Sequence, residues 1–92
     1  MKYIAGRKDR GDIEISFEPL GEKSGIEIIV ETSIERLYGD KLRAEILKHL
    51  DELGVRDCRI IAIDDGALPY VVRSRVEAAV KLAEKEEISN EG

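Results

Sequence analysis

Two stretches in the first third of the chain alternate apolar and polar side chains, the period-two pattern of a strand with one buried face. In the first stretch Ile13, Ile15 and Phe17 share one side, and acidic or hydroxyl side chains share the other. The second stretch, residues 26–31, places glutamates between isoleucine and valine. The segment 19–25 between them contains proline, glycine and serine, so a short turn and an antiparallel hairpin are predicted.

A helical period replaces this alternation further along the chain. Apolar side chains recur every three or four residues and predict a helix over about Lys41–Leu53. Its stripe consists of Leu42, Ile46, Leu50 and Leu53, with Leu47 beside it. Gly39 interrupts the pattern before this helix, Asp40 is placed to cap it, and Gly54 follows its end. Upstream, Thr32–Glu35 fits a capping box, which predicts a short helical turn.

The second half of the chain contains one compact apolar run and one further helical stripe. Cys58–Ile63 is rich in isoleucine and predicts a strand buried on both faces. With the preceding helix and the strand at 26–31 it makes a β-α-β unit, for which a parallel pair is expected. Asp64–Gly66 is typical of a turn, and Pro69 suits the first turn of a second helix. The stripe of that helix is Val72, Val76, Ala79, Val80 and Ala83.

These elements predict an α+β fold in the order β-β-α-β-α, with two helices packed on one face of a mixed three-stranded sheet. The length of the chain predicts a single domain, residues 1–92. The N-terminal segment, residues 1–9, is expected to be flexible, with Tyr3 and Ile4 holding it to the body. The charged tail, residues 84–92, is expected to fray.

Composition favours a protein-binding or subunit role. Hydrophobic residues make up 42% and charged residues 38% of the chain, and the net charge is −5, which argues against a disordered chain and against a general nucleic-acid surface. The apolar runs are too short to span a bilayer and no secretory signal is recognised, so we expect a cytoplasmic protein without membrane contact. One cysteine and one histidine do not suffice for a Cys/His zinc site. A carrier, adaptor or subunit is therefore favoured over an enzyme.

Four motifs, in order along the chain, resemble those of one known family. They are Ala5-Gly6 followed by Gly11-Asp12-Ile13, then Pro19-Leu20, then Tyr38-Gly39-Asp40, and finally Asp64-Asp65-Gly66-Ala67-Leu68 with Arg73, Arg75, Glu77 and Ala78. The four motifs extend over roughly Ala5 to Ala83, which is most of the chain. The pattern resembles the citrate lyase acyl carrier protein, the gamma chain of that complex, and more distantly the acyl carrier subunit of malonate decarboxylase.

The resemblance implies a non-catalytic carrier subunit. In that family a prosthetic-group transferase attaches phosphoribosyl-dephospho-coenzyme A (phosphoribosyl-dephospho-CoA) to a serine through a phosphodiester. The thiol of this arm carries acetyl and citryl groups between the transferase and lyase subunits, α and β. The cofactor supplies the thioester chemistry, and the protein supplies position and docking. The resemblance thus implies these partners, this cofactor, no metal and no independent activity.

In this resemblance the position of the attachment serine is occupied by Arg10. A guanidinium stays protonated and has no nucleophilic oxygen, so it forms no phosphodiester. Three interpretations remain open: a carrier homologue, a cofactor-free paralogue that acts as a scaffold or binds a nucleotide or CoA phosphate reversibly, or a substitution introduced into a carrier. Gly11 and Asp12 are expected to shape the attachment loop. The nearest hydroxyls in the sequence belong to Tyr3 and Ser16.

The remaining charged residues each have a simple and a functional interpretation. Arg7 and Lys8 form a basic cluster with Arg10, which is either a solvated loop or a phosphate-binding site, since arginine pairs with phosphate bidentately. Arg73 and Arg75, near the start of the second helix, form either surface ion pairs or a docking surface, and the resemblance favours docking. The adjacent aspartates of the last motif are typical of a turn, and no metal is expected.

Overall fold

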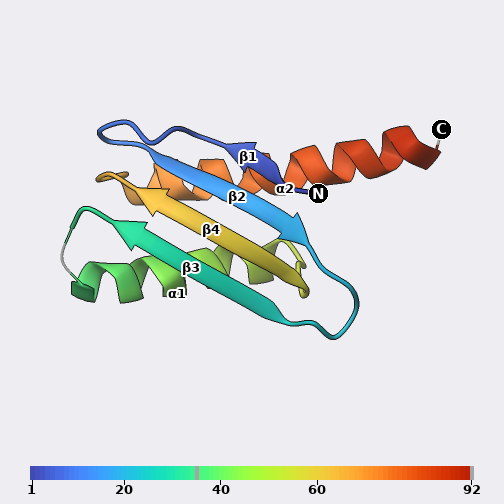
Figure 1. Ribbon diagram of the computed structural model, residues 1–92, viewed down its shortest axis with the longest axis horizontal. Helices are drawn as coiled ribbons and strands as arrows, with labels where there is room; N and C mark the ends of the chain where they lie inside the picture. Colours follow the sequence, from blue (N-terminus) through green and yellow to red (C-terminus); the bar gives the residue numbers. More distant parts are fainter. Residues whose placement is uncertain (35, 92) are drawn as a thin grey trace.

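The structure is a computed structural model that describes residues 1–34 and 36–91. The elements of this part of the chain are β1 (Tyr3–Ala5), β2 (Ile13–Pro19), β3 (Ile26–Thr32), α1 (Arg36–Glu52), β4 (Cys58–Asp64) and α2 (Pro69–Glu91). The strands form one sheet, and both helices lie against the same face of it (Figure 1). The predicted α+β class is confirmed, although the sheet has four strands and not three.

The strand order is β1-β2-β4-β3, so β4 lies between the two strands that the sequence predicts to form a hairpin. β4 pairs antiparallel with β2 and parallel with β3, so the parallel pair is confirmed and the hairpin prediction is wrong. The connection from β2 to β3 crosses the end of β4. There the Leu20 N–H donates to the Asp57 carbonyl at 3.1 Å, and the Cys58 N–H donates to the Gly25 carbonyl at 3.0 Å. The isoleucine-rich strand thereby pairs along both of its edges, which satisfies its backbone groups.

The first nine residues contain a strand, β1, that the sequence does not predict. Tyr3 pairs with Phe17 and Ala5 with Ile15 along the outer edge of β2. Tyr3 and Ala5 also pack against the core. An uncovered strand edge presents N–H and C=O groups that a neighbouring segment satisfies. Three residues are too few for an alternating pattern to be recognised in the sequence.

The first helix begins earlier than predicted. α1 starts at Arg36, so Gly39 and Asp40 lie inside the helix and do not precede it. Its first turn is held by a tertiary contact, because the Tyr38 hydroxyl donates to the Ala67 carbonyl at 3.2 Å. Packing of this kind contributes more to the stability of a helix than local propensity does, which explains the additional turn.

The capping box predicted at Thr32–Glu35 ends on a residue outside the described ones. Its threonine hydroxyl accepts a hydrogen bond from the Ile34 N–H at 3.1 Å. α2 starts at Pro69, as predicted, and continues to Glu91. The glutamates there and Lys85 are good helix formers. The fraying predicted for 84–92 stays a prediction. Within the described residues no helix is both long and apolar enough to cross a bilayer.

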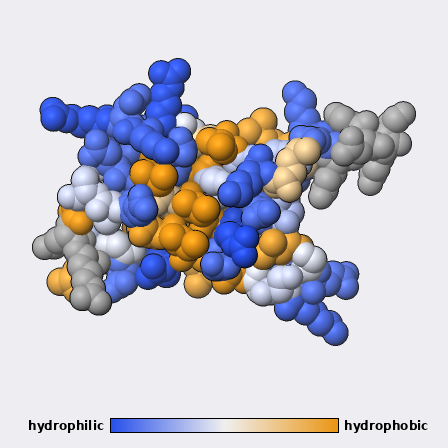
Figure 2. Space-filling model, viewed as in Figure 1, coloured by the Kyte–Doolittle hydropathy of each residue, from blue (hydrophilic) through white to orange (hydrophobic). Residues whose placement is uncertain are grey.

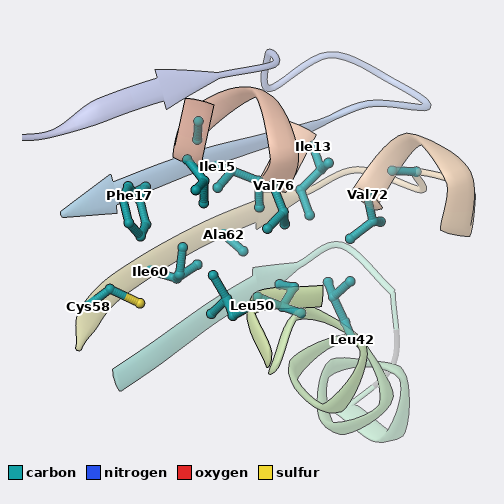
Figure 3. Packing of buried hydrophobic residues seen from close by; sticks show 14 of the residues in the cluster. Ile13, Ile15, Phe17, Leu42, Leu50, Cys58, Ile60, Ala62, Val72 and Val76 are labelled. Carbon is teal, nitrogen blue, oxygen red and sulfur yellow. The ribbon is translucent and has the colours of Figure 1, made fainter. Parts of the chain in front are cut away.

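The core lies between the helices and one face of the sheet (Figure 3). Its fully buried side chains come from β2, β4 and one stripe of each helix, and include Ile13, Ile15, Leu42, Ile46, Leu50, Ile60, Val72 and Val76. The predicted stripes are thus confirmed, except that Leu47 is 46% exposed. The prediction that β4 is buried on both faces is wrong. Its burial alternates, because both helices cover the same face of the sheet and leave Arg59, Ile61 and Ile63 partly exposed on the other.

Candidate functional site

The candidate site is the loop between β1 and β2, residues 6–12, which contains the position that the family resemblance assigns to the prosthetic group. Two main-chain hydrogen bonds tie this loop to the turn between β4 and α2. The Gly11 N–H donates to the Asp65 carbonyl at 2.6 Å, and the Asp65 N–H donates to the Asp12 carbonyl at 3.0 Å. The loop therefore has a defined place at one end of the sheet (Figure 1).

Arg10 occupies the second position of a tight turn in this loop. The Asp12 N–H donates to the Asp9 carbonyl at 2.9 Å and closes the turn. Gly11, the third residue, has a φ of +79°, which glycine adopts without strain. The Arg10 side chain is exposed, and no hydrogen bond or ion pair to it is found within the described part of the chain. The turn thus presents position 10 to solvent.

Asp12 fixes the end of the loop to α2. Arg75 donates through Nε to Oδ1 at 3.0 Å and through Nη2 to Oδ2 at 3.1 Å, the bidentate geometry in which arginine pairs most strongly with a carboxylate. The Ile13 N–H donates to the same Oδ1 at 2.7 Å. The hydrogen bond from Arg75 holds the pKa of the Asp12 carboxyl below its usual value, and burial opposes this effect only in part. Two motifs 63 residues apart therefore meet in one ion pair.

We expect Asp12→Asn to lower the free energy of unfolding by about 1 kcal/mol at neutral pH, because the amide keeps the shape of the carboxylate but not its charge. The folded-state pKa of Asp12 is depressed, so its stabilising contribution is present above the usual aspartate pKa and is lost as the pH falls through the folded-state value. Urea unfolding at neutral and at acid pH measures this difference.

Asp40→Asn is the control for this prediction, since it removes only an exposed ion pair to Arg43. It should leave the free energy of unfolding nearly unchanged at both pH values. The stability of Asp12→Asn and of the wild type should converge in acid. A difference that persists in acid would contradict the role given to the Asp12 charge.

Gly6 allows the loop to pass close beneath the start of β2. Its φ is +86°. A Cβ atom at this position would overlap the Ile13 carbonyl oxygen and would lie 3.0 Å from Cδ of Arg75. Backbone cannot yield as the end of a flexible side chain can, so only glycine fits here. The same close approach brings the loop alongside the Arg75 side chain that binds Asp12.

The turn that receives the loop is built around the buried carboxylate of Asp64. This carboxylate accepts hydrogen bonds from the Thr32 hydroxyl at 3.0 Å and from the N–H groups of Gly66 and Ala67 at 3.3 and 3.0 Å. The contact of Tyr38 with Ala67 completes the cluster. The aspartate motif thus builds a turn, as predicted. Among the described residues no group of three His, Cys, Asp or Glu side chains is placed to hold a metal ion.

Hydroxyl groups are absent from the loop itself, since no serine, threonine or tyrosine lies between Gly6 and Asp12. Ser16 is buried within the sheet. An exposed hydroxyl beside the anchoring turn belongs to Ser33, which donates to the Asp65 carboxylate at 2.8 Å. Sequence reasoning named Asp65 only as part of a turn and did not single out Ser33, because only the folded chain brings these two residues to the loop, across a separation of 32 residues.

Of the basic residues of the loop, Lys8 has carboxylates around it. Lys8 lies 4.0 Å from Glu14 and lines an open pocket of about 300 Å³. Glu31, Asp64 and Asp65 line the same pocket, so carboxylates outnumber the lysine there. A phosphate in this pocket would meet net repulsion, which argues against phosphate binding beside Lys8. Phosphate contacts of the exposed Arg7 and Arg10 stay a prediction.

The two arginines predicted to form a docking surface differ in their contacts. Arg73 lies on the surface of α2, with its Nε 3.5 Å from a Glu77 carboxylate oxygen. Arg75 donates to Asp12 and so anchors the loop. Arg7, in the loop, is exposed. A docking role for Arg73 and Arg75 stays a prediction, and for Arg75 the structure adds a positioning role.

Comparisons with known proteins identify relatives of this chain. A family model for an acyl carrier protein, described as the malonate decarboxylase delta subunit (MdcD), matches residues 1–83. The citrate lyase acyl carrier protein of Vibrio cholerae serotype O1 (strain ATCC 39315 / El Tor Inaba N16961) is 37% identical over 80 residues, which cover 87% of this chain and 81% of the relative. The protein of the same name from Streptococcus mutans serotype c is 32% identical over 85 residues, 92% of this chain and 82% of the relative.

A solved structure has the same fold. It is a chain of a Pseudomonas malonate decarboxylase hetero-tetramer in complex with malonate, which superimposes with a TM-score of 0.67 and 24% sequence identity. The match covers 87% of this chain and 80% of that chain. At this identity the likeness concerns the fold alone.

Proposed function

Because this chain belongs to the acyl carrier family of malonate decarboxylase and citrate lyase, we propose that it takes the place of the carrier subunit in a cytoplasmic citrate lyase-type complex. Its partners there are the α and β subunits, which perform the chemistry, and the chain has no activity of its own. The observation that carries the proposal is the anchored loop 6–12. Its bonds to Asp65 and Arg75 hold the carrier position in one orientation on the body.

The prosthetic group of the family does not fit this loop. A phosphodiester to phosphoribosyl-dephospho-CoA needs a hydroxyl, and Arg10 offers a guanidinium that stays protonated. No other residue between Gly6 and Asp12 supplies a hydroxyl. Of the three interpretations we therefore favour the cofactor-free paralogue, which fills the carrier's place as a scaffold. A serine at position 10 would allow the same fold to carry the prosthetic group, and with it the acetyl and citryl thioesters.

Reversible binding of a nucleotide or CoA phosphate is the less favoured form of the cofactor-free proposal. It would use Arg7, Lys8 and Arg10, which lie in one short loop. The carboxylates that line the pocket beside Lys8 oppose an anionic ligand. We therefore infer that the loop contacts protein and not a phosphate.

Co-expression with citrate lyase-type α and β subunits from the same source tests the proposal. We expect the chain to co-elute with both subunits in size-exclusion chromatography, because a carrier subunit stays in such a complex by binding to the other subunits. The same subunits expressed without the chain provide the control for the elution volume. A chain that elutes alone, while the two subunits still associate, would contradict the proposed function.

A further inference from the structure

The face of the sheet opposite the helices carries a row of side chains that crosses all four strands, with isoleucine on β1, β4 and β3 and a buried serine on β2. The pairing of the strands places Ile4 beside Ser16, Ser16 beside Ile61, and Ile61 beside Ile29. We call these four residues the apolar row. Ile4 and Ile29, at its two ends, are 55% and 42% exposed. Figure 2 shows this face, with hydrophobic surface gathered at its centre and hydrophilic surface around it.

One charged row flanks the apolar row on the side toward the β2–β3 connection. It consists of Glu18, Arg59 and Glu27, which are neighbours across β2, β4 and β3. Arg59 donates to Glu18 at 3.2 Å and to Glu27 at 3.1 Å. The single arginine therefore bridges two carboxylates, and this side stays acidic.

The other flank lies toward the candidate site. Glu14 and Glu31 stand on either side of Ile63 across the strands. Lys8, from the loop 6–12, approaches Glu14 at 4.0 Å, whereas no ion pair to Glu31 is found in the described part of the chain. Counting both flanks, the described part of the chain places four glutamates beside the apolar row, and two cations, Arg59 and Lys8, lie near these glutamates. The rim of this face is therefore acidic.

An uncovered face of a sheet normally carries polar side chains that alternate with the buried ones. Here isoleucines occupy outward positions on β1, β3 and β4. An exposed apolar patch with a polar rim is the arrangement found where proteins bind one another.

We propose that the apolar row binds a catalytic subunit of the complex, through a surface of that subunit that is apolar at its centre and carries lysine or arginine side chains around it. This inference rests on the proposed function. The acidic rim selects the partner, because complementary charges steer association and like charges oppose it. A second copy of this chain would bring two acidic rims together, which disfavours self-association through this face.

The position of the loop agrees with docking on this face. Lys8 belongs to the loop and reaches the flank of the apolar row through Glu14. The anchors at Asp65 and Arg75 fix the rest of the loop at the same end of the sheet. A subunit bound on the apolar row would therefore have position 10 at the border of its interface.

The test is the affinity of the full chain for the purified catalytic α and β subunits, measured at low and at high salt. Ile29→Lys places an ammonium at the end of the apolar row and is expected to weaken binding by about tenfold or more. Glu31→Lys reverses a rim charge and is expected to slow association and to reduce its dependence on salt. Leu82→Lys on α2 is the matched control, since Leu82 is 46% exposed and lies in the helical layer. Circular dichroism checks that each variant is folded.

The outcomes separate this inference from the proposed function. Wild-type affinity in Ile29→Lys, or a greater loss in Leu82→Lys, would show that docking uses another face, while the proposed function would stand. A wild-type chain that binds neither subunit would overturn both. A dimer of the chain in sedimentation that Ile29→Lys dissociates would assign the apolar row to a second copy and overturn the inference.

Discussion

An Arg10→Ser variant is expected to gain the mass of phosphoribosyl-dephospho-CoA when it is co-expressed with the family's prosthetic-group transferase and precursor synthase, whereas the native chain keeps its own mass. The serine hydroxyl supplies the nucleophilic oxygen that a guanidinium lacks. The substitution should leave the loop intact, because the Arg10 side chain is exposed. The turn is closed by the Asp12 N–H and anchored by the Gly11 N–H, both of which are main-chain donors. Intact-mass spectrometry of both purified chains decides the result.

Arg10→Ala is the matched control, since it removes the guanidinium without adding a hydroxyl, and it should gain no mass. A mass gain in the native chain would contradict the cofactor-free proposal and would direct peptide mapping to Ser33 and Ser16. Ser33 comes first because its hydroxyl is exposed beside the turn that anchors the loop, whereas Ser16 is buried. No gain in any of the three chains would mean that the family relationship does not extend to recognition by the transferase.

A Gly6→Ala variant is expected to lose about 3 kcal/mol or more of unfolding free energy, from a left-handed backbone angle and from overpacking together. The added Cβ would overlap the Ile13 carbonyl oxygen and would press on the Arg75 side chain. A small domain has only about 5–15 kcal/mol of stability in total, so this loss is a large part of it. Urea unfolding measures the change, and failure to accumulate as folded protein would agree with it.

Gly11→Ala separates the two causes of that loss. Gly11 has a φ of +79°, close to the +86° of Gly6, but nothing lies within 4 Å of a Cβ placed on it. This variant should lose only the cost of the left-handed angle, about 1–2 kcal/mol. Equal losses in the two variants would contradict the close packing of Gly6 against β2.

The candidate site was predictable in part. The resemblance of the motifs to the citrate lyase carrier family points to the loop that contains Arg10, Gly11 and Asp12, and its role as the attachment loop stays a prediction. The partners of that loop were not predictable. Arg75 lies 63 residues from Asp12, and its interpretation from sequence as a docking residue left out the ion pair that it makes.

The sequence by itself determined the local elements of this protein. The alternation around Ile15 and the stripe around Ile46 express periods of two and of about 3.6 residues, which depend only on near neighbours. Gly54, with a φ of +75°, and Pro69 mark helix boundaries for equally local reasons. These features were therefore confirmed, whereas the helix start predicted from Gly39 and Asp40 was wrong, because a tertiary contact of Tyr38 adds a turn before it.

Only the tertiary structure decided the strand order, the fourth strand and the uncovered apolar row. β4 separates β2 from β3 because pairing along both edges satisfies the backbone of the isoleucine-rich strand. β1 forms because β2 then has an edge left to pair. Ile29 and Ile61 face outward because both helices cover the same face of the sheet. Each outcome depends on which surfaces other elements have already occupied, and a local pattern of side chains does not contain that information.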